Sequence, residues 1–160
     1  MTPEAFLENA LRPALKLLPE KMTSDAAIAM CLAIGLQESR FKHRRQIGGP
    51  ARGYLQFEQG GGIRGVLTHP ATMPHIRAVL TCLDYDPMSD PADCYIAIEH
   101  NDILAAAFCR LNLWWLPTPL PKRGDAQGGW DTYVAAWRPG KPKRDTFNAF
   151  YAQAWALVAP

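Results

Sequence analysis

The sequence lacks a long hydrophobic stretch and a recognisable targeting segment. Its longest uninterrupted apolar run extends from Ala26 to Leu36 in a chain of 160 residues. That run is too short to cross a bilayer, and it therefore predicts a buried core helix. The N-terminal residues Met1 to Ala5 contain no basic segment followed by an apolar one, so no secretory signal is visible. We expect a chain made in the cytoplasm, without a membrane-spanning segment.

Cysteine and net charge are also scarce. The four cysteines, at positions 31, 82, 94 and 109, form no CxxC pair and no spacing with histidine that suits a metal. We therefore expect free thiols and no metal site. The chain has 17 Lys and Arg residues against 15 Asp and Glu residues, a formal net charge of +2. This balance is too near zero to indicate nucleic-acid binding by itself.

Apolar residues make up 48% of the sequence, which also contains 14 prolines and 12 glycines. This composition provides a core for one domain over residues 1–160, built of short elements with many loops. Residues 42–62 predict an extended loop or short hairpin, and no strand alternation is clear elsewhere. We therefore expect an all-α or α-dominated fold. Helical spacing of apolar residues predicts helices over 3–18, 25–41, 63–67, 73–83, 92–115, 129–137 and 145–158.

Glu38 stands at the end of the most apolar predicted helix, where Ile34 and Cys31 share its face. Desolvation and the negative end of the helix dipole both disfavour an ionised carboxylate there, so its pKa should be raised. A general acid for glycosidic cleavage needs a carboxyl group that is protonated near neutral pH. The alternative interpretation is a solvated helix end, with Glu38 near Arg40 or Lys42.

Short motifs extend this pattern. Glu38-Ser39 is followed by Ala51-Arg52-Gly53-Tyr54-Leu55-Gln56, and later by Ala135-Ala136-Trp137-Arg138-Pro139-Gly140. In this order they resemble the catalytic block of the lytic transglycosylases and related lysozyme-like muralytic enzymes. That family has Glu-Ser at a helix end, a loop of the form G-A-x-G-L-M-Q, and an A-A-Y-N-A-G segment.

The resemblance covers residues 26 to 142 and includes departures. Trp137 and Arg138 replace the family's tyrosine and asparagine, and Pro50 stands where the family often has glycine. Asn101, with Ala105 and Phe108 after it, resembles the family's N-I-x-x-G-x-x-Y helix more weakly. The first and last predicted helices lie outside the resemblance.

The resemblance implies a lysozyme-like, two-lobed helical domain with a cleft for peptidoglycan glycan strands. Glu38 would protonate the oxygen of the MurNAc-β-1,4-GlcNAc bond and then accept the proton of the muramic C6 hydroxyl. That oxygen would close onto C1 as a 1,6-anhydro product. No metal or cofactor is implied. We expect a monomeric phage or prophage protein, carried by the virion or acting in the host periplasm, with no nucleic-acid or membrane partner.

The candidate substrate-binding residues are Ser39, Tyr54, Gln56, Glu58, Asn101, Trp137 and Arg138. Several of them have a purely structural alternative. Gln56 could stabilise its own loop, Tyr54 and Trp137 could belong to the core, and Ser39 could be a helix-terminal hydroxyl. Glu58 could be a favourable acid at a helix N-terminus.

Other functions stay open at this point. A lysozyme-type hydrolase needs a second carboxylate, for which Glu58 is the best candidate. Asp131, Glu99 and Asp102 have weaker claims, and we expect the last two to be solvated on their helix. A non-catalytic virion or wall-binding module of the same fold is a further alternative. The run from Arg40 to Arg45 is basic, and we expect it to be a solvated loop. Nucleic-acid binding through residues 40–52 is the weakest alternative, because this segment lacks a basic stripe interleaved with aromatic residues.

Overall fold

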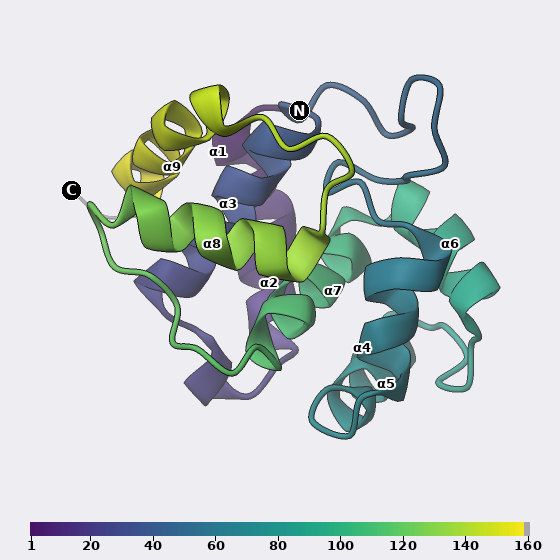
Figure 1. Cartoon of the computed structure of the whole chain (residues 1–160). Coiled ribbons are helices and arrows are strands. Elements are labelled where there is room, and N and C mark those ends of the chain that lie inside the picture. Colours follow the sequence, from purple (N-terminus) through teal and green to yellow (C-terminus); the bar gives the residue numbers. More distant parts are fainter. Residues whose placement is uncertain (159–160) are drawn as a thin grey trace.

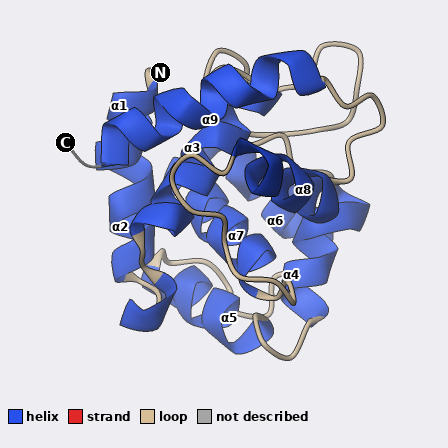
Figure 2. Ribbon diagram, turned by 60° about the vertical axis from the view of Figure 1, so that its left-hand side comes forward, coloured by secondary structure: helices blue, strands red, loops and turns tan. Residues whose placement is uncertain are grey.

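The computed structural model describes residues 1–158, and its regular structure is helical (Figures 1 and 2). No strand occurs among these residues; only isolated bridges join Arg45 to Arg52 and Arg52 to Phe57. The all-α prediction is confirmed. The α-helices are α1 Pro3–Phe6, α2 Arg12–Lys16, α3 Asp25–Glu38, α4 Arg64–Thr68, α5 Met73–Cys82, α6 Pro91–His100, α7 Asp102–Trp114, α8 Ala126–Trp137 and α9 Arg144–Val158.

Helix α3 is the buried helix that the apolar run predicts. Every residue from Ala27 to Leu36 is buried. The helix begins where Ser24 Oγ accepts a hydrogen bond from the backbone N–H of Ala27 at 3.1 Å. Helix α9 packs along it, and α7 provides a second helix buried almost all round. The C-terminal end of α3 therefore carries Glu38 out of the centre of the core.

The first predicted helix contains an irregular turn. Helices α1 and α2 are joined without a break by a π-helical turn, Leu7–Leu11. Pro13 follows directly in the first turn of α2. Because proline has no N–H and its ring clashes with the preceding turn, a regular α-helical ladder cannot run through this position.

The predicted helix over residues 92–115 is two helices in the structure, which corrects that expectation. Asn101 ends α6 and begins α7, with extended backbone angles of φ −120° and ψ 98°. Its side-chain oxygen accepts a hydrogen bond from Leu104 N at 3.0 Å. An asparagine at this position competes for backbone donors and so favours a cap over a helix interior.

Helix α8 starts earlier than predicted, because Asp125 caps it through a hydrogen bond from Gly128 N at 2.9 Å. The segment between α3 and α4 is irregular up to Glu58, as predicted, and a π-helical turn, Gln59–Ile63, leads into α4. Gly53 has a φ of +72°, and a Cβ there would lie 3.0 Å from the carbonyl oxygen of Ile98. Glycine is thus needed where this segment touches α6.

Candidate active-site cleft

A cleft of about 1030 Å³ opens beside the C-terminal end of α3. Its lining includes the end of α3, parts of the segment from Gln46 to Gly62, the start of α4, and the end of α8 with the loop that follows. Helix α7 contributes Asn112. Segments far apart in the sequence therefore meet around the carboxyl group of Glu38, which lines the same cleft.

Glu38 is largely buried and has an unusual pKa. Burial raises the pKa of its carboxyl group from 4.5 to about 7. A hydrogen bond from the Tyr133 hydroxyl to Glu38 Oε1, at 2.7 Å, opposes this shift, and the negative charge of Glu58 adds to it. Within residues 1–158 no cation forms an ion pair with Glu38. The carboxyl group can therefore hold a proton near neutral pH and release it there.

Tyr133 was not predicted from the sequence. It lies on α8, one helical turn before Trp137, and this spacing is the signal that could have found it. Its ring stacks on Phe147 of α9 with centroids 5.5 Å apart, which fixes the position of the hydroxyl group. Burial raises the pKa of the Tyr133 hydroxyl, so it stays a hydrogen-bond donor toward Glu38.

Four of the predicted substrate contacts line the cleft with Glu38: Gln56, Glu58, Trp137 and Arg138. Gln56 is buried, and its Nε2 donates to the carbonyl oxygen of Gly53 at 2.8 Å. No described residue donates to its Oε1, which leaves this acceptor for a ligand. Glu58 is exposed on the segment before α4.

Trp137 and Arg138 form the end of α8. The indole Nε1 of Trp137 donates to the carbonyl oxygen of Leu55 at 2.9 Å, and its ring lies against Phe57 with centroids 5.2 Å apart. Arg138 has a left-handed backbone with φ +47°, and it ends the helix with its side chain exposed. The A-A-W-R-P-G segment is thus attached to the G-Y-L-Q segment at one wall of the cleft.

The three other predicted contacts, Ser39, Tyr54 and Asn101, do not line the cleft. The Ser39 hydroxyl is buried, donates to the carbonyl oxygen of Tyr54 at 2.6 Å, and accepts from Phe41 N at 3.0 Å. The ring of Tyr54 is buried beneath the guanidinium of Arg44, 4.4 Å from its centroid. Asn101 is occupied as the cap of α7. These residues support the framework around the cleft.

Two further residues hold the cleft walls and were not predicted. Asn112 Nδ2 donates to the carbonyl oxygen of Ala136 at 3.0 Å, which ties α7 to α8. Gln37 Nε2 donates to the carbonyl oxygen of Lys143 at 3.0 Å, which ties the end of α3 to the loop between α8 and α9. Single amides at such positions carry no pattern that distinguishes them from solvated surface residues.

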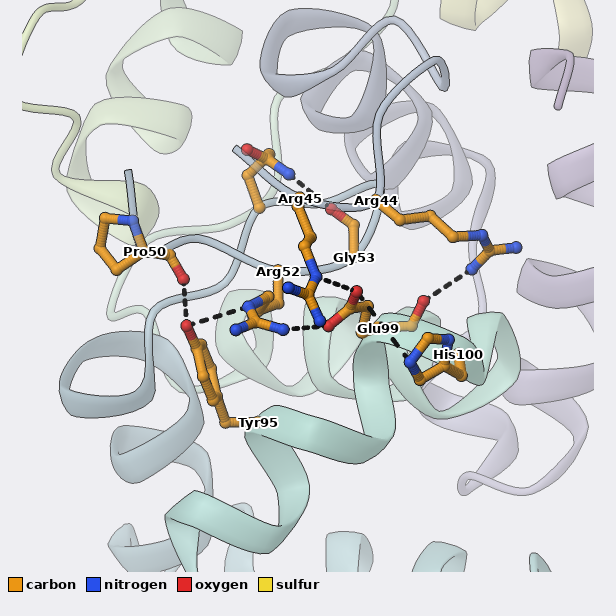
Figure 3. A network of polar contacts seen from close by, with 9 residues as sticks. Arg44, Arg45, Pro50, Arg52, Gly53, Tyr95, Glu99 and His100 are labelled. Carbon is orange, nitrogen blue, oxygen red and sulfur yellow. Dashed lines mark hydrogen bonds and ion pairs between the residues drawn. The ribbon is translucent and has the colours of Figure 1, made fainter. Parts of the chain in front are cut away.

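A network of ion pairs holds the segment after α3 against α6 (Figure 3). Glu99 is buried and accepts hydrogen bonds from Arg45 and Arg52, while Tyr95 of the same helix donates to the carbonyl oxygen of Pro50. The bond from Arg45 is the main reason that the pKa of Glu99 is lowered. The expectation of a solvated Glu99 is therefore wrong.

Asp102 is likewise not free in solvent. It accepts two hydrogen bonds from Arg44, at 2.7 and 2.8 Å, in a bidentate pair. Three arginines of the basic segment are thus paired with carboxylates of α6 and α7. The expectation that the basic run Arg40 to Arg45 is simply a solvated loop is corrected for Arg44 and Arg45.

The described part of the chain carries neither a cluster of metal ligands nor a membrane-spanning helix. Residues 1–158 contain no group of three or more His, Cys, Asp or Glu side chains placed to hold a metal ion. None of the helices over this range is long and apolar enough to span a membrane. The four cysteines carry free thiols.

Comparison of the chain with protein-family models, with curated proteins and with solved structures gave no match. Assignment of a function therefore depends on the cleft and on the motifs of the sequence.

Proposed function

We propose that the protein is a lysozyme-like muralytic enzyme, a lytic transglycosylase that cleaves the MurNAc-β-1,4-GlcNAc bond of peptidoglycan. One observation carries the proposal: Glu38 lines a cleft of about 1030 Å³ and has a pKa raised to about 7. This volume is at the upper end for small-molecule pockets, which suits a polymer lying across the surface. The motif order around Glu38 supports the same class of enzyme.

In the proposed reaction, neutral Glu38 gives its proton to the glycosidic oxygen as the bond from that oxygen to C1 breaks. The resulting carboxylate then takes the proton of the C6 hydroxyl while O6 bonds to C1. The attacking hydroxyl belongs to the reacting sugar, which gives it a high effective molarity. Tyr133 holds the carboxyl group in place, and the free Oε1 of Gln56 can accept a hydrogen bond from the sugar.

A hydrolase of the same bond is the second candidate, and Glu58 favours it. This carboxylate lines the same cleft and its charge acts on Glu38, so the cleft holds a pair of carboxyl groups. In a hydrolase, Glu58 would activate water or attack the sugar while Glu38 serves as the acid.

Digestion of purified peptidoglycan, followed by mass spectrometry of the released muropeptides, tests the proposal. Wild-type protein should release 1,6-anhydro ends, one water lighter than hydrolysed ends, and Glu58→Gln should still release them. Reducing ends from the wild type, together with an inactive Glu58→Gln variant, would establish the hydrolase instead. If the folded wild type binds the wall but releases no muropeptide, the protein is a non-catalytic wall-binding module.

A further inference from the structure

Four cationic side chains line the cleft: Arg64, Arg138, Lys141 and Lys143. All four are exposed, and none forms an ion pair or lies over an aromatic ring within residues 1–158. The carboxyl groups that share the cleft with them are those of Glu38 and Glu58. Arg44, Arg45 and Arg52, by contrast, are all matched by carboxylates.

The unpaired cations come from two separate parts of the chain. Arg64 begins α4, and the other three belong to the residues between α8 and α9, a loop held to α3 by the hydrogen bond from Gln37 to Lys143. A ligand that lies in this cleft therefore meets cations from both parts of the chain.

We infer that these four cations form a subsite for the carboxylates of peptidoglycan stem peptides, an inference that rests on the proposed function. In an uncleaved strand the lactyl group of the muramic sugar is amide-linked to the stem, so the negative charge is carried by the peptide. Flexible lysine side chains suit mobile carboxylates, because a point charge needs no fixed geometry. The subsite favours strands that carry anionic stems over strands whose stems are neutral.

The test compares two forms of one substrate. Gram-negative sacculi are used as isolated, or after their carboxyl groups have been converted to amides with a carbodiimide and methylamine.

The test variant combines Arg64→Gln, Lys141→Gln and Lys143→Gln. Arg138 is left in place because its backbone ends α8. The matched control removes three exposed, unpaired cations outside the cleft: Lys16→Gln, Lys42→Gln and Lys122→Gln.

The test variant should release muropeptides from native sacculi roughly tenfold more slowly than wild type, the combined effect of about three exposed ion pairs. On amidated sacculi it should match wild type, and the control should match wild type on both substrates. A misfolded variant would instead lose activity on both. Equal wild-type rates on the two substrates, with the test variant behaving as the control, would overturn the subsite and leave the proposed function intact. Absence of cleavage of either substrate by wild type would overturn both.

Discussion

Glu38 and Glu99 are two carboxylates withdrawn from solvent in opposite electrostatic surroundings. Glu38 has a tyrosine hydroxyl and a neighbouring negative charge, and its pKa is raised to about 7. Glu99 has two arginines, and its pKa is lowered. Burial alone therefore does not set the protonation state; the presence or absence of a matched cation does.

The difference divides the molecule into a framework region and a reactive region. Around Glu99, ion pairs hold the segment after α3 in place and lower the pKa of the carboxyl group. Around Glu38, the fold keeps a carboxyl group without a cation, which costs stability but supplies a transferable proton. The same segment, from residue 44 to residue 58, connects the two regions. Paired charges behind the cleft thus position residues that face it.

The largest expected effect comes from Glu38→Gln, which keeps the size of the side chain and removes its proton. We expect release of muropeptides to fall by about a thousandfold or more, since acid–base catalysis by one positioned group contributes about 10² to 10⁴. Quantitative chromatography of digests measures this loss. Asp131→Asn on α8, outside the cleft, is the matched control and should retain wild-type activity. Substantial cleavage by Glu38→Gln would remove Glu38 from its catalytic role.

The same variant should be more stable than wild type at alkaline pH. The folded pKa of about 7 exceeds the unfolded value of 4.5, so the folded state binds the proton more tightly. Wild-type stability therefore falls as pH rises from about 4.5 to 7, by about 3 kcal/mol from this group. Urea unfolding at pH 4 and pH 8 should show the difference between variant and wild type growing by that amount. A difference that does not change with pH would contradict the raised pKa.

Glu99→Gln tests the framework region. Removal of the charge leaves Arg45 and Arg52 without their carboxylate, and we expect a loss of about 1–3 kcal/mol in the free energy of unfolding. The variant should also cleave peptidoglycan more slowly, because the segment that carries Gln56 and Glu58 loses two of its ion pairs to α6. Unfolding curves and muropeptide release measure the two effects. Glu20→Gln, an exposed and unpaired acid, is the control and should change neither.

Much of the helical framework follows from the sequence, for reasons that are local. The apolar run predicts the burial of α3. The division between α6 and α7 was missed because a stripe of apolar residues continues across Asn101, and only the capping chemistry of asparagine marks the break. The π-helical turn before Pro13 was missed because the spacing of apolar residues does not show that one turn of a helix contains an extra residue.

The candidate site was only partly predictable, because its geometry depends on distant segments. Glu38 could be singled out from its own helix. The hydroxyl of Tyr133 reaches it from 95 positions away in the sequence. The pairing of Glu99 with Arg45 and Arg52 likewise depends on how the segment after α3 packs against α6, which no local pattern specifies.

The smallest expected effects are two shifts of opposite sign in the pH dependence of kcat/KM. The Tyr133 hydrogen bond lowers the pKa of Glu38 and the charge of Glu58 raises it. Cleavage needs the protonated carboxyl group, so activity should decline with pH as Glu38 ionises near pH 7. Tyr133→Phe should therefore move this decline to higher pH, and Glu58→Gln should move the decline of its remaining activity to lower pH. Initial rates on sacculi across pH 5–9 measure both.

In the double variant the pH of this decline should lie between those of the two single variants, since the Tyr133 hydroxyl and the Glu58 charge act separately on Glu38. Shifts in the same direction for both variants would show that Glu38 is not the group whose ionisation ends the reaction.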